Sequence, residues 1–402
     1  MAKSYDIAII GGGIVGLASA KTLVNKTKTS LIVLEAEDQL AAHQTGHNSG
    51  VIHSGLYYRP GSLKARTCTD GREALYTFCE EHGVAYDRCG KVVVATSEEE
   101  IPRLQDLQER GTANGLRDIK WLSGEEIQEY EPHVTGVAGL HVPQTGIVDY
   151  AEVTSKYAEV VKSRDGEIRT NSEVMNCQRD ESEFVLVTPD GEIRCKNVIN
   201  CTGLQSDRVA RMFGAEPDVK IVPFRGEYSE LKPEKHHLVN NLIYPVPDPK
   251  FPFLGVHFTR MIHGGVEAGP NAVLALEREG YTKWNVSVRD TFDTLTYGGF
   301  WKLAGKFWKT GFGEVYRSFS KGAFVNALQK LIPELSSEDV TPGGAGVRAQ
   351  ALDKDGKLID DFRIVEMQGM IHVLNAPSPA ATASISIGQT IADMAVKNFD
   401  LN

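Results

Sequence analysis

The chain has 402 residues and a formal net charge of −10, from 53 acidic and 43 basic side chains. This acidic balance argues against a protein built mainly to neutralise nucleic-acid phosphates, so we expect small-molecule partners and no nucleic acid. A hydrophobic content of 41% in a chain of this length allows two or three folding units.

Cysteine and histidine usage gives no sign of a metal centre. The six cysteines contain no C-x-x-C pair and the 11 histidines show no zinc-ligand spacing, so we expect reduced structural thiols and no metal. The first residues lead directly into a glycine-rich turn without the basic and apolar regions of a secretory leader, so export is not expected. Since no stretch approaches the roughly 20 apolar residues of a spanning helix, we expect any membrane contact to be peripheral.

The N-terminal segment has the pattern of a βαβ unit. The sequence predicts a buried strand over 5–10, a helix over 14–24 and a second buried strand over 30–35. The turn between the first strand and the helix carries the motif G-x-G-x-x-G, and an acidic residue closes the second strand. This combination predicts dinucleotide binding more strongly than the glycines alone would, although the motif does not separate FAD from NAD.

Each residue type of this motif has a physical role. Gly11 allows the tight turn, Gly13 lets a pyrophosphate approach the helix N-terminus, and Gly16 permits close packing of helix on strand. Glu35 can accept hydrogen bonds from a ribose diol, and its charge disfavours the 2′-phosphate of NADP. The dinucleotide-binding residues predicted here are Gly11, Gly13, Ile14, Val15, Gly16 and Glu35.

The rest of the chain alternates helical and strand-like segments. A polar loop over 41–60 is followed by predicted helices over 64–82, 98–114, 149–163, 206–213, 295–331 and 384–396. Strands are predicted over 91–95, 174–177, 183–188, 196–201 and 370–375, with a loop over 377–382. Residues 222–275 alternate strand-like pieces with Pro and Gly turns, which is typical of an antiparallel sheet.

Several blocks of the sequence resemble the D-amino-acid-oxidase-like FAD-dependent oxidoreductases, and within them the branch that oxidises L-2-hydroxyglutarate. The more specific blocks are TGHNSGVIHSGLYY at 45–58 and NAPSPAAT at 375–382; others are VINCTGLQSD at 198–207, PFRGEY at 223–228, HFTR at 257–260 and GPNA at 269–272. The resemblance covers nearly the whole chain. It implies FAD as the cofactor, and hydride transfer from L-2-hydroxyglutarate to flavin N5 to give 2-oxoglutarate.

The resemblance also implies the domain organisation. We expect an α/β fold with a discontinuous Rossmann-like FAD-binding domain, together with a substrate domain made of a mainly antiparallel sheet and helices. The FAD-binding domain is expected over 1–85, 145–220 and 335–402, and the substrate domain over 86–144 and 221–334.

Two loops are expected to meet the flavin, because an isoalloxazine ring needs nearby backbone donors and protein dipoles tune its electronics. The loop over 45–50 can supply such donors, and a helix that follows 379–382 can direct its positive end at the ring. An ordinary turn and an ordinary N-cap are the alternatives. His47 is either a neighbour of the ring or a covalent tether. The predicted contacts are Thr45, Gly46, His47, Asn48, Ser49, Gly50, Val174, Thr202, Gly203, Pro379, Ala380, Ala381 and Thr382.

Oxidation of a 2-hydroxy acid needs a base for the hydroxyl proton, and a neutral imidazole suits this step. His53 and His257 are favoured over His263, with a structural histidine as the alternative for each. A diacid needs two carboxylate grips, for which arginine is suited. Arg225, Arg260 and Arg348 are the candidates, against the alternative of surface ion pairs; the family resemblance favours Arg348. Tyr57, Tyr58 and Tyr228 can add phenolic donors.

The segment 295–331 is both aromatic and basic. It carries nine aromatic side chains between 297 and 324, and six Lys or Arg against Glu314 alone up to Lys330. This pattern is typical of interfacial helices that meet an anionic lipid surface, and it predicts electron transfer to a membrane quinone at the cytoplasmic face of the inner membrane. The alternatives are a helical pair packed on the substrate domain, O2 as the electron acceptor, and a soluble cytoplasmic protein.

Other functions remain open at this point. Within the same superfamily the alternatives are a flavin amine oxidase and a glycerol-3-phosphate dehydrogenase, although a diacid is better served by several Arg and His. Outside it, the alternatives are a flavin-dependent RNA-modifying protein, disfavoured by the acidic balance, and a non-catalytic dinucleotide-binding module. The sequence does not indicate the oligomeric state.

Overall fold

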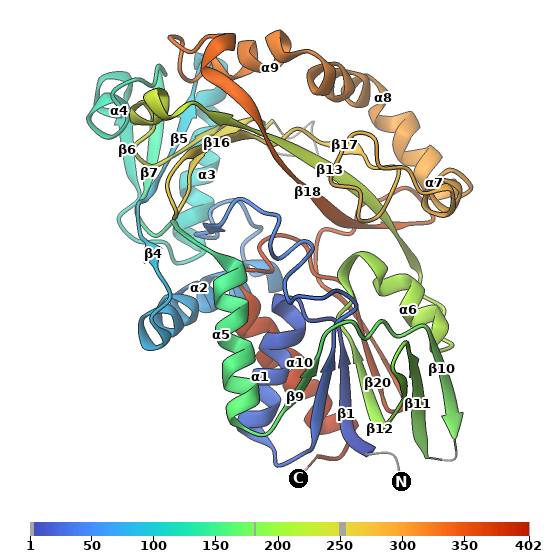
Figure 1. Cartoon of the computed structure of the whole chain (residues 1–402). Helices are drawn as coiled ribbons and strands as arrows, with labels where there is room; N and C mark the ends of the chain where they lie inside the picture. Colours follow the sequence, from blue (N-terminus) through green and yellow to red (C-terminus); the bar gives the residue numbers. More distant parts are fainter. Residues whose placement is uncertain (1–3, 181, 249–254, 402) are drawn as a thin grey trace.

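The computed structural model describes residues 4–180, 182–248 and 255–401 (Figure 1). Two large sheets lie at opposite ends of the molecule in Figure 1, with loops and a small sheet between them. The first sheet has the strand order β10-β11-β12-β1-β2-β9, with β20 beside β12 and β19 beside β20. Its strands are β1 (Ser4–Ile10), β2 (Leu31–Leu34), β9 (Glu167–Arg169), β10 (Asn176–Asp180), β11 (Glu183–Thr188), β12 (Gly191–Asn200), β19 (Arg363–Met367) and β20 (Met370–Asn375).

The alternation of side chains along β1 explains why both faces of this sheet are covered. Ile7 and Ile9 pack against the helices of one face, whereas Ala8 and Ile10 face a second apolar cluster that includes Val209. The first face carries α1 (Ile14–Lys26), α2 (Leu63–His82), α5 (Tyr150–Ser163) and α10 (Ser384–Asn398), and the second carries α6 (Ser206–Met212). The parallel pairs β1–β2, β1–β12 and β12–β20 confirm the predicted Rossmann-like fold.

The second sheet has the order β17-β13-β16-β15-β14-β5-β7-β6, with β18 beside β13. Its neighbouring strands are antiparallel except for β5 and β14, which are parallel. The strands are β5 (Lys91–Ala95), β6 (Lys120–Ser123), β7 (Ala138–Val142), β13 (Val219–Leu231), β14 (Leu242–Pro245), β15 (His257–Arg260), β16 (Val266–Gly269), β17 (Val273–Leu274) and β18 (Val340–Asp353). Its mainly antiparallel character confirms the sheet expected for the substrate domain.

Helices pack around the second sheet. Its helical elements are α3 (Ile101–Ala113), α4 (Gly124–Tyr130), α7 (Val288–Leu295), α8 (Gly298–Phe319) and α9 (Lys321–Leu328), with short 3-10 turns over Glu98–Glu100, Pro233–Leu238 and Ser337–Asp339. Figure 1 shows α7, α8 and α9 running along the outer side of β13 and β18, away from the first sheet. Between the two large sheets lies a small one made of β3 (Val51–Ile52), β4 (Tyr86–Asp87) and β8 (Gly146–Val148).

One long strand differs from the sequence-based expectation. The resemblance implies that residues 335–402 belong to the FAD-binding domain, but β18 pairs with β13 along nearly its whole length, in the second sheet. The chain rejoins the first sheet only at β19. The sequence does not predict this strand because glycine, which stands at 343, 344 and 346, is depleted in strands and typical of turns.

Candidate active site

The glycine turn after β1 brings a bare backbone to the start of α1. Gly11 has a φ of +109°, and a Cβ atom there would lie 2.5 Å from the carbonyl oxygen of Cys201. Gly13 is the N-cap residue of α1, and a Cβ atom there would meet only Thr45 Oγ1, at 3.3 Å. Gly13 has no side chain to cap this helix end, so a phosphate can approach the backbone N–H groups of the first turn other than that of Ile14, which Thr45 Oγ1 accepts.

Glu35 lies directly beside this turn, at the end of β2. Its carboxylate is 8% exposed and accepts hydrogen bonds from the backbone N–H groups of Gly12, at 2.6 Å, and Glu37, at 3.0 Å. A carboxylate with two oxygens has further acceptor positions for a ribose diol. The predicted pairing of turn and acid is therefore present, and these residues fit the adenosine diphosphate half of FAD.

The loop over 45–50 is held by its own side chains. Thr45 Oγ1 accepts the N–H of Ile14 at 3.1 Å, and Asn48 donates to Thr45 O at 2.6 Å and accepts from Gly50 N at 2.9 Å. The loop also touches the second sheet: a Cβ atom on Gly346 of β18 would lie 2.3 Å from His47 O. The segment predicted to contact the flavin therefore lies between the nucleotide turn and β18.

Thr382 links the C-terminal loop to the same region. Its side chain is fully buried, its Oγ1 accepts the backbone N–H of His53 at 3.0 Å, and it lies 2.8 Å from the Tyr150 hydroxyl. Helix α10 begins two residues later, at Ser384. The structure therefore brings together the two loops, 45–58 and 375–382, that the sequence singled out separately.

Beyond this junction, basic and phenolic side chains gather in one region, which we call the basic cluster. Its members are His53, Tyr57, Tyr58, Lys91, Tyr228, Tyr244, His257 and Arg348. Lys91, Tyr244 and His257 are buried, Arg348 is exposed, and the other members are partly exposed. They come from the loop after β3, from β5, from the long strands β13 and β18, and from β14 and β15. The cluster is rich in cations and hydrogen-bond donors, which suits it to an anionic ligand.

Both histidines of the basic cluster are neutral. Burial, together with the positive charges of Lys91, Lys64 and Arg348, lowers the pKa of His53 to about 3. Burial, with the charges of Arg348 and Lys91 outweighing a hydrogen bond to Gly255, lowers the pKa of His257 to about 4. The Nδ1 atom of His257 lies 2.9 Å from the Gly255 carbonyl, which can only accept. Nδ1 therefore carries the proton, and Nε2 is left as a base.

Stacking and hydrogen bonding position the cluster. The His257 ring stacks on Tyr244 with centroids 4.0 Å apart and planes 21° apart. Burial raises the pKa of Tyr228 to about 12, against the opposing charge and hydrogen bond of Arg348. The Tyr57 hydroxyl is buried and has no hydrogen-bond partner within the described residues. Since an unsatisfied buried hydroxyl is unfavourable, Tyr57 fits a site that a ligand completes.

The structure does not bring the other predicted arginines into the basic cluster. Arg225 donates to Glu227 at 2.9 Å and to Thr282 O at 2.7 Å. In the β13–β18 pair Arg348 lies opposite Phe224, so these two side chains share one face of the sheet. Arg225 follows Phe224 in β13 and therefore points to the opposite face from Arg348. Arg260 pairs with the carboxylate of Asp87. Both arginines therefore already have a carboxylate partner within the protein.

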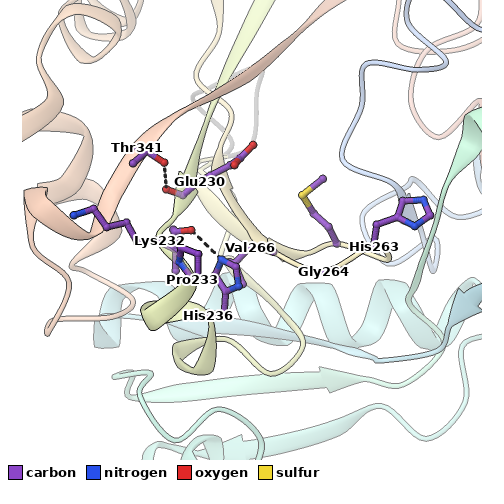
Figure 2. A pocket seen from close by; sticks show the side chains of 11 residues that line it. Glu230, Lys232, Pro233, His236, His263, Gly264, Val266 and Thr341 are labelled. Carbon is purple, nitrogen blue, oxygen red and sulfur yellow. Dashed lines mark hydrogen bonds between the residues drawn. The ribbon is translucent and has the colours of Figure 1, made fainter.

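His263 and His47 lie apart from the cluster's stacked pair. His263 is exposed and lies 3.0 Å from Asp149 Oδ2, beside a pocket of about 530 Å³ at one end of β13 and β16 (Figure 2). His236 and Thr341 also line this pocket, and no member of the basic cluster does. The His47 ring stacks on Tyr281 at 4.1 Å.

Sequence reasoning missed Lys91 and Tyr244. A lysine at the head of the buried run Lys-Val-Val-Val-Ala was a usable signal, because lysine is almost never fully buried without a partner. Tyr244 gave no comparable signal, since tyrosines are common in strands.

Sequence reasoning also missed a group formed by Glu37, His43 and Glu279, whose ligand atoms lie within 4.8 Å of one another. The absence of a metal stays a prediction.

The outer helices divide the predicted aromatic segment into two sets. Phe324 is buried in the core, and Tyr297 donates to Leu352 O at 3.0 Å. Five aromatic side chains of α8 are instead exposed by 56% to 71%. They are Trp301, Trp308, Phe312, Tyr316 and Phe319, and Trp284, Val288 and Phe292 before α8 are also exposed. We call this set the exposed aromatic face.

The acidic residue of this segment is turned inward. Glu314 accepts the N–H of Ala272 at 3.1 Å and pairs with Arg317, and Lys302 pairs with Asp355 at 3.0 Å. Since the sequence count already includes Glu314, of these two ion pairs only that of Lys302 with Asp355 makes the local positive charge smaller than that count. Within the described part of the chain, no helix is both long enough and apolar enough to cross a bilayer.

The nucleotide turn, its acid and the basic cluster define a flavin-dependent oxidoreductase, and residues 6–394 match the family model described as FAD dependent oxidoreductase. The chain belongs to this family and is an enzyme that uses FAD.

Among named relatives, the chain is 53% identical to the L-2-hydroxyglutarate dehydrogenase of Indibacter alkaliphilus, over 98% of this chain and all of that one. It is 49% identical to the enzyme of the same name from Escherichia coli, over 96% and 92% of the two chains. It is 47% identical to the mitochondrial enzyme of Homo sapiens, over 99% and 90%.

Solved structures share the fold. An L-alpha-glycerophosphate oxidase from Mycoplasma pneumoniae with FAD bound matches with a TM-score of 0.81 at 23% identity, over 100% of this chain and 96% of that one. A glycine oxidase from Geobacillus kaustophilus matches with a TM-score of 0.73 at 18% identity, over 98% and 95%. At this identity the likeness confirms the architecture and leaves the substrate open.

Proposed function

We propose that the chain oxidises L-2-hydroxyglutarate to 2-oxoglutarate. The observation that carries this proposal is the basic cluster, in which neutral His53 and His257 lie within the field of the cations Lys91 and Arg348. A dicarboxylate would neutralise the two cations, and a neutral imidazole would accept the hydroxyl proton. The names of the relatives at 47% to 53% identity support the same substrate.

The nucleotide turn, Glu35 and the loops over 45–50 and 379–382 are the residues that would hold FAD, which supplies the two-electron oxidant. We propose the remaining predicted contacts, Val174, Thr202 and Gly203, as part of the same site. Their proximity to Gly11 supports this for Thr202, whose Cα would lie 3.3 Å from a Cβ atom on Gly11.

We assign the proton step to His257. As the C2 hydrogen leaves the substrate with its electron pair, Nε2 accepts the hydroxyl proton and C2 becomes a ketone carbon. The Gly255 carbonyl fixes the tautomer, and Tyr244 holds the ring plane. Arg348 holds the substrate carboxylate next to C2, and Tyr57 donates a hydrogen bond to it. A substrate dianion in the cluster also favours the imidazolium that results.

Anaerobic reduction of the bound flavin tests the substrate. L-2-hydroxyglutarate should bleach the flavin absorbance, whereas sn-glycerol 3-phosphate and glycine, which represent the rival alcohol and amine substrates, should not. Bleaching by one of those two compounds, but not by the diacid, would assign the site to a different member of the family.

We also propose that the enzyme binds an anionic membrane surface and passes its electrons to a membrane quinone. The exposed aromatic face supports this, because aromatic side chains insert into the headgroup region, and lysines at 306, 321 and 330 can meet anionic lipid. We place this contact at the cytoplasmic face of the inner membrane. Reduction of a ubiquinone analogue in lipid vesicles by the substrate-reduced enzyme tests the acceptor; electron transfer to O2 alone would contradict it.

A further inference from the structure

Lys91 is a buried cation that has no ion-pair partner among the residues that the structure describes. It heads β5, between β7 and β14, and its side chain is 1% exposed. Its Nζ atom lies 4.3 Å from the centroid of the Tyr57 ring and 4.9 Å from that of Tyr244. A cation over two aromatic faces gains some electrostatic stabilisation, but this does not replace a carboxylate.

The groups around Lys91 provide no negative charge. Across residues 4–180, 182–248 and 255–401, its ammonium forms neither an ion pair nor a hydrogen bond. Burial raises the pKa of Cys68 to about 12 and that of Tyr57 well above its usual value, so both stay protonated. His53 and His257 are neutral. Leaving a buried ammonium uncompensated is costly, which calls for an anion from outside the chain.

Lys91 and Arg348 both influence the two imidazoles. The positive charges of both residues lower the pKa of His53 and of His257. For Lys91 the geometry agrees, because its Nζ lies 4.9 Å from the centroid of the Tyr244 ring, on which the His257 ring stacks at 4.0 Å. The other predicted grips, Arg225 and Arg260, are already paired with Glu227 and Asp87. Lys91 and Arg348, which is hydrogen-bonded to Tyr228, each carry one positive charge, and a diacid carries two negative ones.

We propose that Lys91 is the counter-ion of the second substrate carboxylate, across the site from Arg348, and selects dicarboxylic over monocarboxylic 2-hydroxy acids. This inference rests on the proposed oxidation of L-2-hydroxyglutarate. It assigns Lys91 to substrate binding and specificity, and leaves the proton step with His257. Burial lowers the pKa of Lys91 to about 7, and a bound carboxylate would raise it.

Replacing Lys91 by the uncharged, similarly long methionine tests the proposal. The two substrates to compare are L-2-hydroxyglutarate and L-2-hydroxypentanoate, which has the same chain length and a methyl group in place of the second carboxylate. For K91M we expect the ratio of kcat/KM, diacid over monoacid, to fall by roughly 100-fold or more, because one partner of a buried charge pair is removed. K91R should retain most of the preference.

Binding without turnover gives an independent readout. Glutarate and pentanoate can be titrated into the oxidised holoenzyme and followed by the perturbation of flavin absorbance. K91M should weaken glutarate binding by a similar factor and pentanoate binding much less. Lys64 is the matched control: its Nζ lies 5.1 Å from the Tyr58 ring centroid but pairs with Asp360 at 3.0 Å, so K64M should keep the wild-type ratio.

Three results would overturn the proposal: an equal loss for both substrates in K91M, wild-type glutarate affinity in K91M, or no glutarate binding by the wild-type holoenzyme. If K91M loses its flavin, K91R and K91Q replace it in the same comparison. If the wild-type enzyme binds glutarate through Lys91 but does not oxidise the diacid, the proposed reaction fails while the assignment of Lys91 stands.

Discussion

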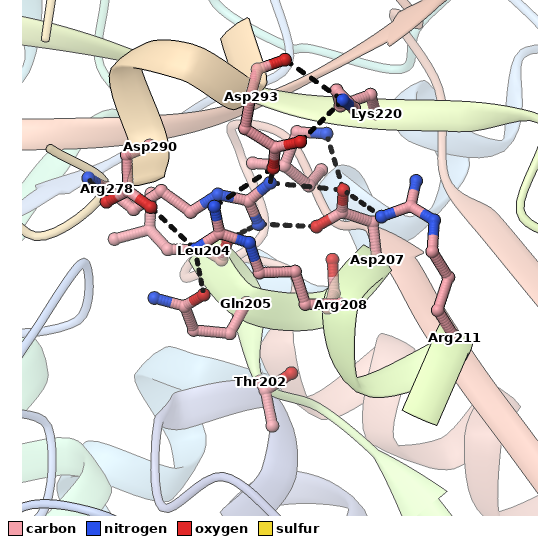
Figure 3. A network of polar contacts seen from close by, with 12 residues as sticks. Thr202, Leu204, Gln205, Asp207, Arg208, Arg211, Lys220, Arg278, Asp290 and Asp293 are labelled. Carbon is pink, nitrogen blue, oxygen red and sulfur yellow. Dashed lines mark hydrogen bonds and ion pairs between the residues drawn. The ribbon is translucent and has the colours of Figure 1, made fainter. Parts of the chain in front are cut away.

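Arg278 and Asp207 form an almost completely buried ion pair that joins the two parts of the fold. Their side chains are 2% and 0% exposed, and Arg278 Nη2 donates to Asp207 Oδ2 at 3.1 Å. Asp207 belongs to α6 on the first sheet, and Arg278 lies in the loop before α7. Arg208, Lys220 and Asp293 extend the network around them (Figure 3). This network holds the outer helices to the FAD-binding part.

Breaking this pair should destabilise the protein strongly. Arg278→Leu leaves a buried carboxylate, which costs about 3–5 kcal/mol of unfolding free energy. Arg211→Leu removes a half-exposed partner of the same carboxylate and should cost less than about 1 kcal/mol. Chemical denaturation of the two holoenzyme variants measures the difference. Equal costs would contradict the importance of burial here.

The same pair predicts how stability depends on pH. Burial alone would raise the pKa of Asp207, but the hydrogen bonds and charge of Arg278 hold it below its usual value. The stability gained from a depressed carboxyl pKa is present above the unfolded pKa, which is about 4, and is lost as pH falls through the folded pKa. The stability gap between wild type and Arg278→Leu should therefore narrow below about pH 4.

His257 should be required for the proton step. His257→Gln keeps a polar side chain but removes the base, so we expect kcat to fall by roughly 10²- to 10⁴-fold with the FAD content retained. His263→Gln is the matched control in the turn of the same β15–β16 hairpin, because His263 is exposed and pairs with Asp149. If His53→Gln abolishes turnover while His257→Gln keeps it, His53 is the base instead.

The pH dependence of kcat/KM should reflect Lys91 rather than the histidines. Values of about 3 and 4 for the pKa of His53 and His257 keep both neutral above pH 5, so no acid limb is expected near pH 6.5. The pKa of Lys91 is about 7, so its charge is present below pH 7 and lost above it. The value of kcat/KM for the diacid should therefore decline above pH 7. Tyr57, Cys68 and Tyr244 also face Lys91, but all three stay protonated in this range.

A profile measured from pH 5 to 9 on wild type and K91M checks this prediction. The variant should lack the decline near pH 7. A decline that persists unchanged in K91M would assign it to another group.

The exposed aromatic face should govern membrane affinity. Replacing both Trp301 and Trp308 by Ala should reduce cosedimentation with anionic vesicles at least about tenfold and leave turnover in solution unchanged, because each indole contributes buried apolar area at the interface. Met175→Ala removes an exposed apolar side chain elsewhere and should bind like wild type. Equal binding of all three proteins would show that the exposed aromatic face does not govern membrane affinity.

The sequence predicted the first sheet well because its signals are local. Glycine spacing, a terminal acid and short buried strands placed β1, α1 and β2 within a few residues of their observed bounds. β18 was missed because its pairing with β13 is a long-range contact that local propensity does not encode. The glycine-rich stretch over 343–346 is typical of a turn when read alone.

The candidate site was predictable in part. The roles of Arg348, His53, His257 and Tyr57 in the site stay predictions, which rest on the family motifs that carry these residues. The sequence could not distinguish Arg225 and Arg260 from Arg348 as candidates for carboxylate binding. Their carboxylate partners within the protein, and the face of the sheet to which Arg225 points, depend on strand pairing and register. Lys91 becomes informative only when its burial and the lack of an acid among the described residues around it are both visible.

A single anaerobic turnover tests the central claim most directly. Holoenzyme mixed with excess L-2-hydroxyglutarate in the absence of any acceptor should lose its oxidised flavin absorbance and yield one 2-oxoglutarate per FAD reduced. Flavin that stays oxidised while glutarate still perturbs its spectrum would show a diacid-binding site without this oxidation, and would contradict the proposed function.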